Sequence, residues 1–270
     1  MRQSTSLARL LASAAVTAIL AAGLGGCQTM SDITGSITPK AEASPGPESD
    51  ARRSVDVYGE RYRADPKNPD AALAYGQALR ATGQRPQAVA ILEQATITHP
   101  GNRALLAGYG RALADNGNFQ QAFDVLTRAH TPENPDWRIL SVQGTALDQL
   151  GRHDEARRYY DSALKIAPEE PSVLSNLGIS YVLSKDLPKA EEVLRRAYAN
   201  TKADVRVRQN LGLVVGLQGR FAEAETIVKA DLPAEEAAAN VAYLKEMLSR
   251  KDNPRAGASR MPVASLNRPD

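Results

Sequence analysis

Small and apolar residues recur along residues 51–249 at spacings of 3, 4 and 7, which place them on one face of a helix. An amphipathic segment, a turn and a second amphipathic segment follow one another, and this succession repeats along the chain at a constant interval. The repeat predicts five two-helix units, which span residues 69–102, 103–136, 137–170, 171–204 and 205–238. A partial unit with a helix over 52–64 precedes them, and a terminal capping helix over 234–249 follows them.

Ten small residues recur without exception at the repeat interval, which is the 34 residues from Gly76 to Gly110. They are Gly76, Gly110, Gly144, Gly178 and Gly212 and, 12 positions after each, Ala88, Ala122, Ala156, Ala190 and Ala224. A glycine inside a helix costs about 1 kcal/mol relative to alanine. Five such glycines at one phase therefore indicate helices that approach too closely for a larger side chain. The predicted turns also carry glycine at a fixed phase, except the fourth, which has Lys185.

This pattern resembles the tetratricopeptide repeat, in which antiparallel helix pairs stack into a right-handed superhelix. The fourth unit shows it most fully, with Asn176-Leu177-Gly178, Tyr181, Ala190, Leu194 and Ala197. The resemblance covers roughly residues 51–249 and departs from the family pattern at Lys202 and Asp231. It implies an all-α fold, an α-solenoid whose units each bury an apolar face against the next.

Residues 1–26 have the layout of a secretory signal, with a basic start, an apolar run from Leu10 to Leu24 and no acid before Asp32. A transmembrane anchor is the alternative, but the run is short and rich in alanine and glycine. Leu24-Gly25-Gly26-Cys27 resembles the bacterial lipobox, and Cys27 is the only cysteine of the chain. We therefore expect residues 1–26 to be removed and Cys27 to carry a covalent lipid.

The segments that flank the repeats lack apolar periodicity. Residues 27–50 are rich in Ser, Thr, Pro, Gly and Ala and read as a flexible tether, and residues 250–270 read as a disordered tail. Gln28 stands where an aspartate often marks retention at the inner membrane. The expected location is therefore the periplasmic face of the outer membrane, held by the lipid.

No constellation of catalytic residues emerges from the sequence. His99, His130 and His153 lie in different phases of the repeat and are not at metal-ligand spacing. Phosphate loops, dinucleotide fingerprints and nucleophile elbows are also missing. Without residues 1–26 the chain has 31 basic and 31 acidic side chains (33 minus Arg2 and Arg9, against 31), which argues against nucleic-acid binding. We expect no enzyme activity, no metal, no small-molecule substrate and no cofactor besides the lipid.

In tetratricopeptide-repeat proteins, ligands usually lie along the concave face formed by the first helix of each unit. Transferring those positions to this chain selects the polar residues Gln77, Arg111, Arg138, Asp148, Asn176, Gln209 and Asn210. The Lys, Arg and Asn ladder that clamps a peptide carboxyl terminus is interrupted at Leu73, Ala107, Thr145 and Ile179.

The later units carry apolar residues at positions of this face that are often polar in the family. They are Ile179, Val182, Leu183, Leu213 and Leu217. Such a stripe would form a groove that binds a helix or a strand. The alternative is burial by the chain itself, through the last helix or the tail residues Met261-Pro262-Val263.

The chain as a whole resembles the TadD family, the tetratricopeptide-repeat lipoproteins of tight-adherence (Flp) pilus machines. Besides the lipobox and the repeats, the likeness rests on the run from Asn210 to Phe221 and on Ala238, Asn240, Tyr243 and Leu244. It implies a pilotin-like assembly factor whose partner is the outer-membrane secretin or another pilus component. Two alternatives stay open: a periplasmic adaptor that organises peptidoglycan enzymes, and a component of outer-membrane protein assembly.

Overall fold

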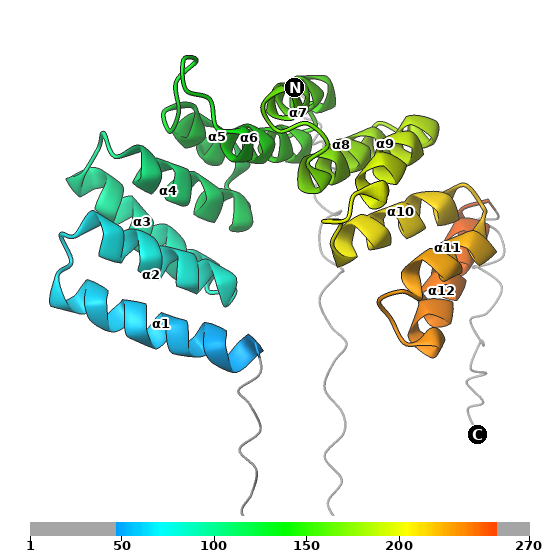
Figure 1. Ribbon diagram of the computed structural model, residues 1–270, viewed down its shortest axis with the longest axis horizontal. Helices are drawn as coiled ribbons and strands as arrows, with labels where there is room; N and C mark the ends of the chain where they lie inside the picture. The colour runs from blue at the N-terminus through cyan, green and yellow to red at the C-terminus, as the bar shows by residue number, and fades with distance from the viewer. Residues whose placement is uncertain (1–46, 253–270) are drawn as a thin grey trace, which may run out of the picture. The chain divides into compact units, whose positions relative to one another are not determined.

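The computed structural model describes residues 47–252, which form twelve helices and no strand (Figure 1). The predicted signal segment and Cys27 lie outside the described residues. Helix α1 (Pro47–Ala64) begins with a proline, which lacks an N–H and suits the first helical turn. Residues 47–50 therefore belong to this helix and not to a tether. Helix α12 (Ala234–Asp252) likewise extends to residue 252, inside the predicted tail.

Ten helices between these two form five pairs, and they confirm the all-α repeat fold. The first helices of the pairs are α2 (Pro69–Ala81), α4 (Arg103–Asp115), α6 (Trp137–Gln149), α8 (Pro171–Leu183) and α10 (Val205–Leu217). The second helices are α3 (Arg85–Thr98), α5 (Phe119–Thr127), α7 (His153–Ile166), α9 (Leu187–Ala199) and α11 (Phe221–Val228). Within each set, successive helices begin one repeat interval apart, as the sequence predicts.

The turn inside each pair contains one residue in the left-handed conformation. Gly83, Gly117, Gly151 and Gly219 have φ between 74° and 86°. Lys185 occupies the same place in the fourth pair with φ of 64°. Only glycine adopts this conformation without steric cost, so the fourth turn is strained relative to the others.

The periodic glycines mark the crossing of the two helices in each pair. A β-carbon built on Gly76 would lie 2.5 Å from Leu92 Cγ, and one built on Gly178 would lie 2.6 Å from Leu194 Cγ. The side chain that packs against each glycine always belongs to the residue 16 positions later. These residues are Leu92, Leu126, Tyr160, Leu194 and Val228. These distances are shorter than any normal contact, which confirms that the glycines permit close approach.

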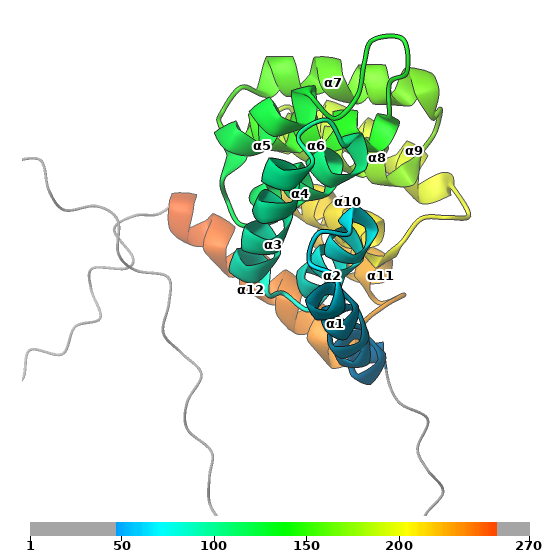
Figure 2. The same ribbon diagram turned by 90° about the vertical axis from the view of Figure 1, so that its left-hand side faces the viewer.

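The first helices contact one another in succession from α2 to α10, whereas the backbones of the described second helices do not meet. Figure 1 shows this succession, and Figure 2 shows it with the side of α1 and α2 toward the viewer. The first helices therefore form the inner, more tightly spaced edge of the stack. The buried residues lie between the two layers, in clusters that run from α2 to α11.

Helix α12 ends the array by packing against α10 and α11. It buries Ala237 and places Leu244 Cδ2 only 2.6 Å from where a β-carbon of Gly216 would lie. On another side it leaves Tyr243 and Met247 exposed. Among residues 47–252, no helix combines the length and the apolar character that a membrane crossing requires.

Candidate protein-binding surface

One residue of each first helix forms a line along the inner edge of the stack, which we call the inner stripe. It consists of Gln77, Arg111, Thr145, Ile179 and Leu213, each separated from the next by one repeat interval. Each directly follows the glycine that faces the second helix, so it points about 100° away from that contact. Gln77 and Leu213 are exposed and the other three are half-buried. The stripe changes from polar in the first two units to apolar in the last two.

The polar half of the surface is a cluster of arginines. Arg111 is half-buried and makes no hydrogen bond or ion pair with any residue in 47–252. Burial lowers the pKa of its guanidinium, Asp136 opposes this, and Arg80 and Arg138 lower the pKa further. Arg80 pairs with Asp115 at 2.6 Å, and Arg138 lies 4.4 Å from the centre of the Trp137 ring. Arg111 and Arg138 can therefore form ion pairs with carboxylates of a binding partner.

The apolar half lies on α8 and α10, which are adjacent. Leu183 and Leu213 remain 45% and 39% exposed, and Ile179 and Leu217 are half-buried beside them. Helix α12 thus leaves these leucines accessible. Val182 is half-buried as well, and its side chain packs against the core between the fourth and fifth units.

The prediction was wrong for Asp148, which is buried. Its carboxylate accepts hydrogen bonds from the Tyr160 hydroxyl at 2.9 Å and the Ser180 hydroxyl at 2.8 Å, and His153 Nδ1 lies 2.9 Å away. Asp148 lies in α6, whereas Tyr160 and His153 lie in α7 and Ser180 lies in α8. Asp148 holds three helices together and has no free oxygen to offer a ligand.

Asn176 and Asn210 face the preceding first helix. The amide of Asn176 donates to Ser141 Oγ at 3.1 Å, and the amide of Asn210 donates to Ser175 Oγ at 2.9 Å. The two pairs have the same separation along the chain, so the same hydrogen bond recurs in two successive units. These amides fix the spacing between units, whereas Gln209 is exposed.

Two features of this face were missed from the sequence. Arg80 contributes to the arginine cluster through its position next to Arg111. Tyr58 of α1, with Ser54, lines an open cavity against α2. The repeat could have indicated Tyr58, because it lies one repeat interval before Leu92, the side chain that packs against Gly76.

The histidines have separate partners and do not converge. His99 Nε2 lies 2.7 Å from the Lys67 carbonyl, and His130 Nε2 lies 3.2 Å from Gln143 Oε1. In the part of the chain that the structure describes, no three His, Cys, Asp or Glu side chains come together as a metal site. Each of the three histidines instead has a local hydrogen-bonding contact of its own.

Comparisons with known proteins agree with this architecture. A family model for the tetratricopeptide repeat matches residues 141–205, and a model described as anaphase-promoting complex, cyclosome, subunit 3 matches residues 57–129. The described residues form a tetratricopeptide-repeat solenoid. No curated protein matches the sequence. Tetratricopeptide-repeat domains mediate protein–protein interaction, so this domain is a protein-binding scaffold.

Solved tetratricopeptide-repeat structures show the same fold at low sequence identity. PilW, described as a widely conserved type IV pilus biogenesis factor, is 18% identical with a TM-score of 0.62, over 71% of this chain and 90% of PilW. A repeat protein from Parabacteroides merdae is 15% identical with a TM-score of 0.61, over 76% of this chain and 79% of that one. The Cut9–Hcn1 hetero-tetramer of the anaphase-promoting complex is 18% identical with a TM-score of 0.61, over 76% of this chain. The chain matches 41% of that protein's length.

Proposed function

We propose that this protein is a non-enzymatic scaffold, anchored by a lipid on Cys27, that assists assembly of a Flp-type pilus. Its partner is a segment of the outer-membrane secretin. One observation carries the binding role: Leu183 and Leu213 stay exposed on adjacent first helices, at the inner edge where repeat units converge. The pilus assignment is supported by the sequence resemblance to the TadD family and by the fold shared with a pilus biogenesis factor.

The proposed mechanism is non-covalent. Each acyl methylene buried in the membrane contributes about 0.8 kcal/mol, so more than one chain on Cys27 gives stable anchoring. The scaffold then captures a secretin segment that places apolar side chains on Leu183 and Leu213. An acidic side chain of the same segment pairs with Arg111 or Arg138, which lack partners of opposite charge in direct contact among residues 47–252. Capture keeps the segment from aggregating until the channel assembles.

Affinity capture from solubilised membranes tests this proposal. The Leu183→Asp/Leu213→Asp double variant places two charges on the apolar half of the surface and should lose the secretin. Ile97→Asp is the matched control, because Ile97 is an exposed aliphatic residue (68%) on the second helix α3. The control should recover the secretin as well as the wild type does.

The identity of the captured proteins separates the candidate functions. Wild-type protein that recovers no secretin contradicts the pilotin-like role. Recovery of peptidoglycan enzymes, or of outer-membrane assembly components, that depends on Leu183 and Leu213 would support the corresponding alternative instead.

A further inference from the structure

Helix α1 occupies the place of a second helix whose first helix is missing from the described residues. A β-carbon on Gly59 would lie 3.1 Å from Tyr75 Cε2. The equivalent pair in the next unit is Glu93 and Tyr109, which are joined by a 3.1 Å hydrogen bond. Helix α1 therefore packs on α2 as α3 packs on α4.

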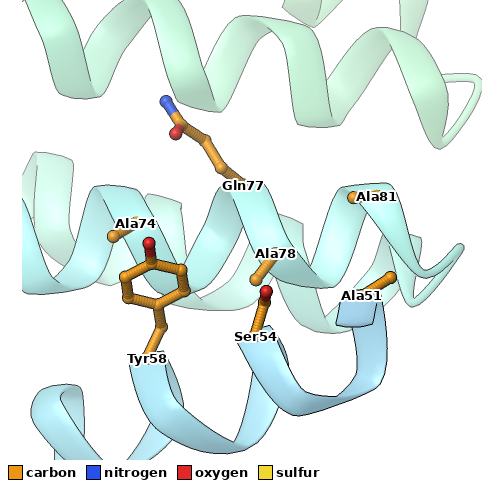
Figure 3. A pocket seen from close by; sticks show the side chains of 7 residues that line it. All are labelled: Ala51, Ser54, Tyr58, Ala74, Gln77, Ala78 and Ala81. Carbon is orange, nitrogen blue, oxygen red and sulfur yellow. The ribbon is translucent and has the colours of Figure 1, made fainter. Parts of the chain in front are cut away.

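The side of α1 that would face a first helix is open. In complete units the equivalent residues are fully buried, as Ala88 and Leu92 are. In α1 they are Ser54 and Tyr58, which are only half-buried. A cavity of about 260 Å³ lies beside them. Figure 3 shows its lining, with Tyr58, Ser54 and Ala51 of α1 and Ala74, Gln77, Ala78 and Ala81 of α2.

The chain's own sequence does not fit this place. The missing helix would span residues 35–47, one repeat interval before α2. Glu42 stands where all five complete units have glycine, and it would collide with Tyr58. Pro39 and Pro45 would lie inside the helix, where each removes a hydrogen bond and costs about 3 kcal/mol. A helix at residues 35–47 is therefore disfavoured here, which favours an occupant from another molecule.

We propose that the groove between α1 and α2 binds a helix of another protein that carries a glycine opposite Tyr58 and a carboxylate four residues later. The third unit supplies the model for this contact. There Tyr160, the counterpart of Tyr58, packs on Gly144 and its hydroxyl donates a hydrogen bond to Asp148. The alanines at positions 74, 78 and 81 leave room for the backbone of the incoming helix. The inference rests on the proposed scaffold function but uses a surface separate from Leu183 and Leu213.

Charge on the groove favours an acidic helix. Arg61 lies 5.6 Å from the centre of the Tyr58 ring, near the place of the expected carboxylate. Arg52 lines an adjoining depression with Ala51, Ala81 and Thr82. Neither arginine forms an ion pair within residues 47–252. Arg61 lies three positions after Tyr58 and therefore on the groove side of α1, where a carboxylate of the incoming helix would meet it.

A labelled peptide with the sequence of residues 136–150 tests the proposal, because it contains α6 with its glycine and its carboxylate. Fluorescence anisotropy with the full chain should show saturable binding. Affinity should fall at least tenfold for Ala74→Arg, which fills the cavity, and for a peptide with leucine at the position of Gly144. Ser54→Arg fills the cavity from α1 and replaces Ala74→Arg if that variant fails to fold. Absence of saturable binding, or equal binding by the filled variants, overturns the proposal.

Two further results would assign the groove to a different occupant. Self-association of the full chain in sedimentation that Ala74→Arg abolishes would mean a second copy, and would overturn a foreign helix. A tenfold gain in peptide affinity after deletion of residues 35–46 would mean occupation by the chain itself. The Leu183→Asp/Leu213→Asp variant separates this proposal from the proposed function, because it should lose the secretin and keep the peptide.

Discussion

The substitution Gly144→Ala tests whether packing requires the periodic glycines. The added β-carbon would lie 2.6 Å from Tyr160 Cε1 and 2.8 Å from Tyr160 Cζ. The Tyr160 ring is 1% exposed, and its hydroxyl is held by Asp148 at 2.9 Å and Thr145 at 3.3 Å. Burial, followed by the Asp148 charge, raises the pKa of this hydroxyl, so it stays a donor. The ring cannot move aside without breaking these bonds.

The magnitude of the effect follows from three contributions. Alanine gains about 1 kcal/mol over glycine in helix propensity. Overpacking of a filled core costs about 1–3 kcal/mol. Loss of a hydrogen bond to a buried charged group costs about 1.5–3 kcal/mol. Gly144→Ala should therefore lower the free energy of unfolding by about 1.5–5 kcal/mol, which for a domain of this size lowers Tm by on the order of 10 °C.

Thermal denaturation followed by circular dichroism, together with urea unfolding, measures this loss. The control is the same substitution in a Tyr160→Ala background, where the clash is gone. In that background Gly144→Ala should be neutral or stabilising by up to about 1 kcal/mol. An equal loss in both backgrounds, or no loss in the wild type, would refute the packing explanation.

Three other changes have defined outcomes. Lys185→Gly should raise the free energy of unfolding by up to about 1 kcal/mol because it relieves a left-handed residue, and an unchanged urea midpoint would contradict this. Burial acts to raise the pKa of Glu191, but hydrogen bonds from Arg220, Gln218 and Arg195 prevail and lower it below 4.5. Its contribution to stability is therefore complete above pH 4.5 and lost as the pH falls further, so Glu191→Gln should flatten the acid side of the stability curve. Cys27→Ser, still cleaved after residue 26, should move the protein from the membrane to the soluble fraction, and full membrane retention would reject the lipid anchor.

The repeat architecture could be predicted because its determinants are local and periodic. Close approach at Gly76 or Gly178 is encoded by a residue type that has no other reason to recur in a helix. The helix boundaries follow from capping residues such as Asn68 and Asp204, whose side chains accept backbone N–H groups. The start of α1 was missed because Pro47 follows a Pro- and Ser-rich stretch that masks its role as a first-turn residue.

The side chains of the surface were harder to predict, because their exposure depends on the neighbouring unit. Asp148 and Val182 occupy the same repeat position, which packs toward the next unit, and Asp148 is buried there whereas Val182 is half-buried. Asp231 departs from the family pattern for a similar reason. Its carboxylate forms a bidentate pair with Arg208 at 2.5 Å, which ties α10 to the loop before α12. None of these contacts leaves a periodic signal in the sequence.

The outer edge of the stack has a mechanical consequence. Between the last two units, the gap between the second helices is bridged by side chains: Arg195 of α9 pairs with Glu223 of α11 at 2.5 Å, and Glu191 pairs with Arg220. Pairs at this level of exposure are screened by salt and contribute about 1 kcal/mol or less each. The inner edge, in contrast, is held by packed apolar contacts. Raising the ionic strength is therefore expected to weaken the contacts between α9 and α11, while α8 and α10 keep the spacing of Leu183 and Leu213.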